Sequence, residues 1–138
     1  MKLLLDTNVI LDVALLRTQW AEDAAALLDA IDRGRAEGYV ASHAITTVHY
    51  VVARERDRRT AATALSDLLR LLAVVPLGTE HFHQALVLGL NDYADAVQAV
   101  AALRIGADYL VTRNAKDYKG APVTPRSAGE VLALLGHP

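Results

Sequence analysis

Short apolar runs that stop abruptly at a polar residue alternate along this chain with stretches of helical periodicity. Lys2–Leu5 stops at Asp6, and Asp108–Val111 stops at Thr112. Such runs are typical of parallel strands buried between two layers of helices. Three further strands are expected, at Tyr39–Ala41, Ala73–Leu77 and Pro122–Thr124. The alternation predicts an α/β fold with a mostly parallel central sheet flanked by helices, and 138 residues suit a single domain, residues 1–138.

Apolar residues repeat at helical spacing in the segments between these strands. Helices are expected at Asn8–Leu16, Trp20–Arg33, His43–Arg56, Thr60–Leu72, Glu80–Leu90 and Asp92–Ile105 and, after Pro125, from about Arg126 to Leu135. In the first helix, Val9, Val13 and Leu16 share one face and should point into the core. Gly34 and Gly38 are expected to bracket a turn before the second strand.

The composition excludes several kinds of chemistry. The chain has no cysteine, which rules out disulfides, thiolate metal sites and a cysteine nucleophile, and which fits a reducing cytoplasm. A net charge of −2 does not indicate nucleic-acid binding by overall charge, although a local basic face or a bound metal could still bind nucleic acid. No stretch approaches the ~18–20 apolar residues of a membrane span. We therefore expect a soluble, cytoplasmic protein without a membrane association.

Four carboxylates from three chain segments are expected to meet at one edge of the sheet. Ligands of open parallel sheets bind at the carboxyl ends of the strands. Asp6 follows the first strand directly, and Asp117 lies in the loop after the fourth. A helix that leads into a parallel strand runs antiparallel to it, so Asp92 and Asp95, at the start of such a helix, belong to the same edge.

Carboxylates gathered in this way repel one another, and one or more would take up a proton unless a cation is present. A hard divalent cation removes the conflict, and carboxylate and water oxygens suit Mg²⁺ or Mn²⁺. Such a site binds a phosphate oxygen and lowers the pKa of a metal-bound water. The reaction that this chemistry favours is hydrolysis of a phosphodiester.

Each acid alone also has a simpler interpretation. Asp92 fits a helix N-cap and Asp95 the first turn of the same helix. Asp6 fits a cap of the first helix, and Asp117 an ordinary turn. Asp12 lies inside the first helix, to the side of its apolar stripe, and is expected to be structural or peripheral. The joint pattern, and no single residue, therefore supports the metal site.

Other classes fit the sequence less well. Phosphatases of the haloacid dehalogenase class need a second Asp where this chain has Asn8, and receiver domains need an Asp where Leu77 and Gly78 follow the third strand. The histidines lack the HExxH spacing of a zinc site and are expected in packing or on the surface. The mixed-charge stretch Arg54–Arg59 is expected to be a solvated helix junction, with an RNA backbone contact as the alternative.

Three motifs resemble those of PIN domains. MKLLLDTNVILD resembles the family's opening motif, an apolar strand followed by D-T-N-x-I/V-L-D. DYADAVQAVAA resembles its acid-bearing helix, and LVTRNAKDY resembles the later T-R-N-x-x-D-F motif. The motifs occur in the family's order and at its distances, and with the helical middle the resemblance covers nearly the whole chain.

The resemblance implies a PIN-like, Rossmann-like fold and a Mg²⁺- or Mn²⁺-dependent ribonuclease of the VapC toxin type. It implies an RNA substrate, a type II toxin–antitoxin pair whose antitoxin covers the site, and a homodimer. By the same resemblance, Asp6 and Asp95 are the principal catalytic metal ligands. Asp92 is an added acid of the metal site, and Asp117 is the acid of the N-x-x-D pattern.

The resemblance also assigns supporting roles. Asn8 and Thr112 would hold the carboxylates in place through hydrogen bonds. Asn114 stands where many relatives have a further Asp. Arg113 or Lys116 would meet the substrate phosphate.

One feature departs from the family pattern. Many PIN nucleases carry a Glu in the third helix, whereas ASHAITTVHYVV has no carboxylate before Glu55. A branch of the family also lacks that Glu and carries a D-x-x-D helix, usually with a further Glu where this chain has Ala94. The departure leaves a second hypothesis open: a catalytically impaired PIN-like module that binds RNA or protein.

Overall fold

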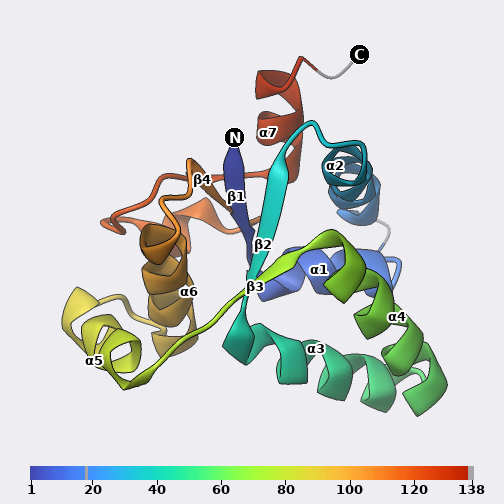
Figure 1. Cartoon of the computed structure of the whole chain (residues 1–138), viewed down its shortest axis with the longest axis horizontal. Coiled ribbons are helices and arrows are strands. Elements are labelled where there is room, and N and C mark those ends of the chain that lie inside the picture. Colours follow the sequence, from blue (N-terminus) through green and yellow to red (C-terminus); the bar gives the residue numbers. More distant parts are fainter. Residues whose placement is uncertain (18, 137–138) are drawn as a thin grey trace.

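The computed structural model describes residues 1–17 and 19–136 and contains a five-stranded, entirely parallel sheet (Figure 1). The strands lie in the order β3-β2-β1-β4-β5. They are β1 (Lys2–Leu5), β2 (Glu37–Ala41), β3 (Ala73–Val75), β4 (Tyr109–Val111) and β5 (Pro125–Arg126). The helices are α1 (Thr7–Ala14), α2 (Ala21–Asp32), α3 (Ser42–Glu55), α4 (Arg58–Leu71), α5 (Thr79–Leu88), α6 (Tyr93–Arg104), the 3-10 helix η1 (Ala115–Tyr118) and α7 (Ala128–Leu134).

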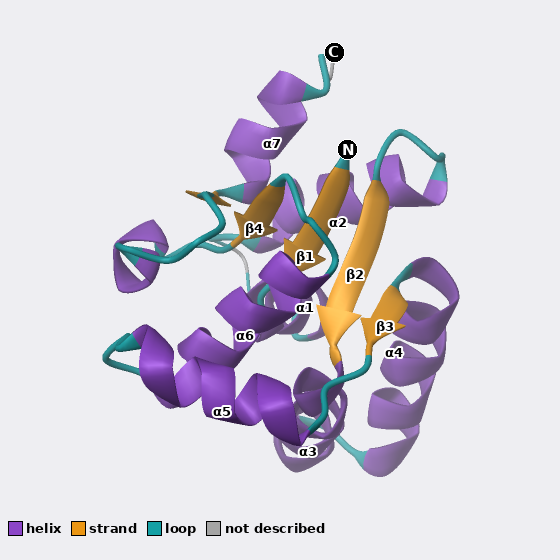
Figure 2. Ribbon diagram, turned by 60° about the vertical axis from the view of Figure 1, so that its left-hand side comes forward, coloured by secondary structure: helices purple, strands orange, loops and turns teal. Residues whose placement is uncertain are grey.

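Strand β1 is the centre of the sheet and is buried on both faces. Leu3 and Leu5 belong to one hydrophobic core, and Leu4 belongs to a second core on the opposite face of the sheet. Helices α1–α4 and α7 contribute to the first core, whereas α6, with part of α5, covers the opposite face (Figures 1 and 2). The expected α/β fold with helices on both faces of a parallel sheet is therefore confirmed.

Apart from the last strand, every expected helix and strand is present, and the bounds of each differ from those expected by at most two residues. No helix in the described part of the chain reaches the length and apolar character that a membrane crossing requires.

The end of the first helix was predicted wrongly. Helix α1 stops at Ala14, and Leu16 adopts a left-handed backbone conformation with φ 51°. Its side chain is 70% exposed, so it does not point into the core as the helical pattern suggested. The backbone N–H groups of Leu15 and Arg17 close the helix by donating to the carbonyl oxygens of Leu11 and Asp12.

The last strand and last helix also differ from expectation. Pro122–Thr124 is not a strand; instead Pro125–Arg126 pairs with β4 at the edge of the sheet. A proline is tolerated there because the backbone N–H groups of Leu110 and Thr112 donate to the carbonyl oxygens of Thr124 and Arg126, so this pairing needs no N–H from Pro125. Helix α7 begins two residues later than expected, behind a capping box formed by Ser127 and Glu130.

Gly38 lies inside β2, paired with Leu3, and does not close a turn. A Cβ at this position would lie 2.8 Å from Cδ1 of Ile31 and would clash with Leu72. The glycine therefore lets the sheet approach α2 and the end of α4 closely.

Gly38→Ala is expected to destabilise the fold by about 1–3 kcal/mol, because two core side chains must shift to make room. Urea unfolding should show this as a lower midpoint. Gly78→Ala is the matched control, since a Cβ there has His81 Nδ1 as its nearest neighbour, 3.9 Å away, and the expected cost is less than about 1 kcal/mol. Equal effects of the two substitutions would contradict this account of Gly38.

Candidate active site

Asp6 is held where β1 ends, beside β4. Its backbone N–H donates to the carbonyl oxygen of Val111 at 2.9 Å, which continues the β1–β4 pairing by one residue. The side chain is only 6% exposed. Thr112, the first residue after β4, donates its hydroxyl proton to Oδ2 of Asp6 at 3.0 Å. The register of the two central strands thus fixes the carboxylate of Asp6 in the buried edge of the sheet.

Tyr118 links Asp6 to Asp95. Its hydroxyl lies 3.2 Å from Oδ2 of Asp6 and 3.2 Å from Oδ1 of Asp95. Tyr118 comes from η1, Asp95 from the first turn of α6 and Asp6 from the end of β1. Two carboxylates that are 89 positions apart in the sequence therefore contact the same oxygen atom.

The pKa of each carboxyl group in this pair lies above its ordinary value. Burial raises the pKa of Asp6, and hydrogen bonds from Thr112 and Tyr118 oppose that rise. Burial, followed by the negative charges of Asp92, Asp6 and Asp117, raises the pKa of Asp95 to about 6. The four acids therefore form one electrostatic cluster, in which Asp95 experiences the charge of the other three.

Asp92 and Asp117 lie at the margin of this cluster. Asp92 is exposed and caps α6, accepting a hydrogen bond at 3.0 Å from the backbone N–H of Asp95. This is the capping role considered from the sequence, and it leaves the other carboxylate oxygen of Asp92 available. Asp117 is exposed in η1. Both acids contribute negative charge at Asp95, and the structure shows no direct contact of either with Asp6.

Arg113 is turned away from the carboxylate pair. Its Nε lies 3.6 Å from Oδ2 of Asp12, and its guanidinium carbon lies 3.7 Å from the centre of the Trp20 ring. Asp12 is buried and also pairs with Arg17 at 3.4 Å. Asp12 is thus an internal anchor, in keeping with a structural role but not a peripheral one. The interactions of Arg113 tie the loop after β4 to α1 and to the start of α2.

The other expected site residues have less specific surroundings. Asn114 donates its backbone N–H to the Thr112 hydroxyl at 3.1 Å. The backbone amide of Asn8 favours the ionised form of Asp6. Lys116 is exposed in η1, on the loop that carries Asp117. Among the residues expected to meet phosphate, Lys116 is therefore the one with an exposed cation.

Two residues at the site were missed by the sequence reasoning. Tyr118 occupies the aromatic position of the N-x-x-D-F pattern. Its hydroxyl, which the Phe of the pattern lacks, could have indicated a polar role at the site. Gln98 is buried one turn after Asp95 and donates to the Thr7 hydroxyl at 2.9 Å, while its own Oε1 lacks a hydrogen-bond partner in the part of the chain described. Gln98 joins α6 to the start of α1, next to Asp6.

The donor set suits a divalent cation that keeps most of its water. Among residues 1–17 and 19–136, no group of three or more His, Asp or Glu side chains is arranged to hold a metal ion. Mg²⁺, however, commonly binds through one or two carboxylates together with several waters. Asp6 and Asp95 offer such a pair, and a cation would relieve the repulsion that Asp92, Asp6 and Asp117 exert on Asp95.

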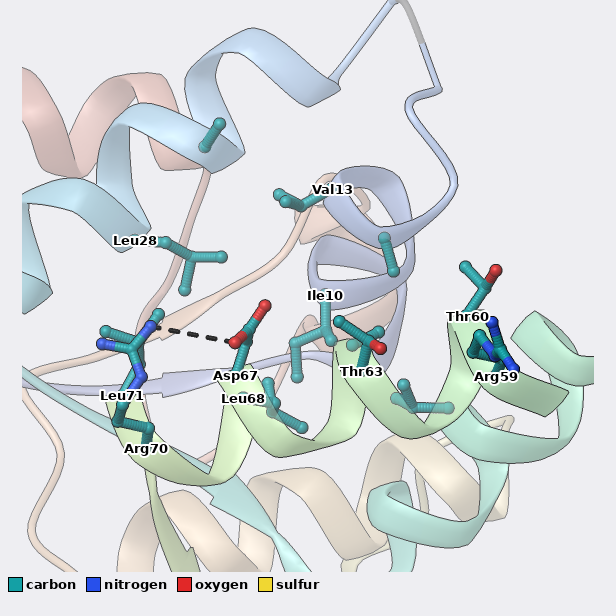
Figure 3. A pocket seen from close by; sticks show the side chains of 14 residues that line it. Ile10, Val13, Leu28, Arg59, Thr60, Thr63, Asp67, Leu68, Arg70 and Leu71 are labelled. Atoms are coloured by element: carbon teal, nitrogen blue, oxygen red, sulfur yellow. Dashed lines mark ion pairs between the residues drawn. The ribbon is translucent and has the colours of Figure 1, made fainter. Parts of the chain in front are cut away.

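A cavity of about 640 Å³ lies elsewhere, between α1, α2 and α4 (Figure 3). Ile10, Leu28 and Leu71 form part of its apolar wall, and Asp67 and Arg70, 3.8 Å apart, lie along it. None of the four acids lines it. The cavity is therefore separate from the carboxylate cluster.

The carboxylates form an acidic site at the carboxyl edge of a parallel α/β sheet, and comparison with known proteins shows the family to which such a chain belongs. A family profile described as PIN domain matches residues 2–116, so the chain belongs to the PIN-domain family. PIN domains are generally nucleases. A comparison with curated proteins finds no match.

Several solved structures have the same fold as this chain. The chain is similar to a chain of VapBC2 from Rickettsia felis bound to a DNA fragment from its promoter, with 17% identity, TM-score 0.74, and coverage of 92% of this chain and 98% of that one. It is similar to a chain of VapBC-1 from nontypeable Haemophilus influenzae, with 15% identity, TM-score 0.69, and coverage of 94% of this chain and 99% of that one. It is also similar to a chain of FitAcB from Neisseria gonorrhoeae, with 19% identity, TM-score 0.65, and coverage of 92% of this chain and 98% of that one. At these identities the likeness concerns the fold.

Asp95→Asn is expected to stabilise the metal-free protein at high pH. The pKa of Asp95 is about 6 in the folded chain and ordinarily 3.8, so the folded state binds more protons than the unfolded state between these values. Stability is therefore lost as the pH rises through that window. In EDTA at pH 8 the variant should exceed wild type by about 1 kcal/mol, a value kept small because solvent screens this partly exposed group.

The difference should largely disappear at pH 3.5, where the carboxyl is mostly protonated in both states. Urea unfolding of both proteins at pH 8 and pH 3.5 measures it. Asp32→Asn, on an exposed residue of α2, is the matched control and should show no such pH-dependent gain. An Asp95→Asn protein less stable than wild type at pH 8 would be inconsistent with the repulsion described above.

Proposed function

We propose that this protein is a Mg²⁺- or Mn²⁺-dependent ribonuclease that hydrolyses RNA phosphodiester bonds. The observation that carries the proposal is the meeting of Asp6 and Asp95 at one hydroxyl, 3.2 Å from each carboxylate. Two acids held this closely at the carboxyl edge of a parallel sheet form a site for a hard divalent cation. Membership of the PIN-domain family supports the nuclease reaction.

The residues of the site have distinct roles under this proposal. Asp6 and Asp95 hold the cation, which when bound supplies an activated water and a contact for a phosphate oxygen. Thr112 fixes the orientation of the Asp6 carboxylate. Asp92 and Asp117 add negative charge around Asp95 and thereby favour cation binding.

Substrate binding involves the loop after β4. Lys116 is exposed there and provides a positive charge for the RNA backbone. Arg113 is engaged by Asp12 and Trp20 and supports the loop instead. Asn114, whose backbone bonds to Thr112, belongs to the same supporting structure.

We propose further that the protein acts in the cytoplasm as the toxin of a type II toxin–antitoxin pair, as a homodimer that a cognate antitoxin protein inhibits. The sequence resemblance to VapC-type toxins supports this role. Support also comes from the similar solved structures, which include complexes named VapBC2, VapBC-1 and FitAcB.

One observation favours the alternative of a catalytically impaired module that binds RNA or protein. Helix α3 has no carboxylate before Glu55, and His49 lies in a groove between α3 and α4, beside Tyr50 and Arg54. In this alternative the acids bind a cation without cleaving RNA. The two functions are separated by the activity of the purified protein.

Purified protein is expected to cleave RNA with Mg²⁺ or Mn²⁺, and EDTA is expected to abolish cleavage. Asp95→Asn should lower the rate by more than about 100-fold, because it removes one of the two charged ligands. The assay follows product formation from labelled RNAs, with Asp32→Asn as a control that retains activity. Activity that persists in both EDTA and Asp95→Asn would disprove the metal-dependent mechanism, and a folded wild type inert on every RNA would favour the binding module.

Expression of the wild-type protein in bacteria should arrest growth, and co-expression of a small neighbouring reading frame that encodes a DNA-binding protein should relieve the arrest. Colony counts and growth curves measure both effects. Asp95→Asn should permit growth at the same protein level. Arrest by Asp95→Asn as strong as that by wild type would show that the toxicity does not depend on the proposed site.

A further inference from the structure

Tyr118 places a neutral hydrogen-bond donor between the two central carboxylates. Its side chain is 1% exposed and packs in the core that contains Leu4, Ala99 and Leu110. The ring is therefore fixed, and the hydroxyl cannot swing out to solvent. Its oxygen remains 3.2 Å from Oδ2 of Asp6 and 3.2 Å from Oδ1 of Asp95.

A hydroxyl has one proton to donate, so Tyr118 serves one carboxylate at a time. Asp6 Oδ2 already accepts a hydrogen bond from Thr112 at 3.0 Å. No other side-chain donor to Asp95 is recorded among the described residues, and its carboxylate experiences the charges of Asp92, Asp6 and Asp117. The Tyr118 hydroxyl is thus the group that reduces repulsion within the pair when no cation is bound.

The same hydroxyl opposes a cation. Mg²⁺ approaches carboxylate oxygens to about 2.0–2.1 Å. An O–H group directed at those oxygens presents its positive end to the cation and occupies one of the lone pairs that the cation needs. A cation that binds through Oδ2 of Asp6 or Oδ1 of Asp95 therefore competes with the O–H for these oxygens, and its binding costs a hydrogen bond to a charged group.

We propose that the Tyr118 hydroxyl is a positioning group that sets the cation affinity of the site: it stabilises the Asp6–Asp95 pair without metal and thereby weakens divalent-cation binding. The inference rests on the proposed metal-dependent function. With this hydroxyl in place, the protein remains folded without metal. The carboxylate pair then binds the cation only when the cation concentration is high enough. The ring provides the packing, and the hydroxyl alone provides the effect on affinity.

Tyr118→Phe keeps the ring and removes the hydroxyl. Isothermal titration calorimetry of the full chain at pH 8 is expected to show Mn²⁺ binding about tenfold tighter in this variant than in wild type, because one charged hydrogen bond is no longer lost on binding. Tyr93→Phe is the matched control. It removes a hydroxyl that donates at 2.9 Å to the carbonyl oxygen of Phe82, and its Mn²⁺ affinity should equal that of wild type.

Melting temperatures provide a second readout. Tyr118→Phe should melt below wild type in EDTA and should gain more from saturating Mn²⁺ than wild type gains. A purely structural role would lower the melting temperature equally with and without Mn²⁺ and leave the affinity unchanged. Unchanged or weaker binding by folded Tyr118→Phe overturns the inference alone, whereas a folded wild type that binds neither Mn²⁺ nor Mg²⁺ overturns the metal-dependent function with it.

A measurement on wild type decides the question if the variant does not fold. In protein labelled with ¹³C at the Cζ of its five tyrosines, Mg²⁺ should shift the Tyr118 resonance, because its hydroxyl changes hydrogen-bond partner. The Tyr93 resonance, assigned from Tyr93→Phe, is the internal reference. Tyrosine resonances that all stay in place at saturating Mg²⁺ would refute the proposal.

Discussion

The parallel pairing of β1 with β4 is the constraint on which the candidate site depends. Leu5 lies opposite Val111, and the next residue, Asp6, extends the pairing through its backbone N–H. That register brings Thr112 within 3.0 Å of the Asp6 carboxylate. A shift by one residue would turn the Asp6 side chain to the other face of the sheet, since side chains alternate along a strand.

Burying and crowding the carboxylates of the site costs folding free energy, which the stability of the surrounding fold offsets. Burial raises the pKa of Asp6, and burial together with neighbouring negative charge raises the pKa of Asp95. A tightly packed sheet and the hydrophobic cores on its two faces provide the stability that lets such a cluster persist. Under the proposed metal-dependent function, a bound cation would relieve the part of this cost that comes from charge repulsion at Asp95.

The loop after β4 is attached to the rest of the fold at both ends and exposes charged residues between them. Arg113 fixes one end of it against Asp12 and Trp20, while Tyr118 fixes the other end in the core beside α6. Between these two attachments the loop carries Lys116 and Asp117 at the surface. Residues that look equivalent in the sequence, such as Arg113 and Lys116, therefore have different surroundings, and only Lys116 is left facing solvent.

The sequence by itself determined the layers, the parallel sheet and the edge at which Asp6 and Asp95 lie. These follow from local periodicity and from the rule that a helix leading into a parallel strand starts at that strand's carboxyl end. It did not determine the left-handed turn at Leu16 or the strand at Pro125–Arg126, because packing and edge pairing override local pattern at the ends of elements.

Only the tertiary structure decided which side chains touch. The hydroxyl of Tyr118 meets Asp6 across 112 positions, and Arg113 meets Asp12 across 101. Spacing along the chain carries no information about such contacts, because they depend on the course of a loop and on which neighbours fill the core around it. The physical reason is that loop conformation is selected by long-range packing, whereas strands and helices are already favoured by their own residues.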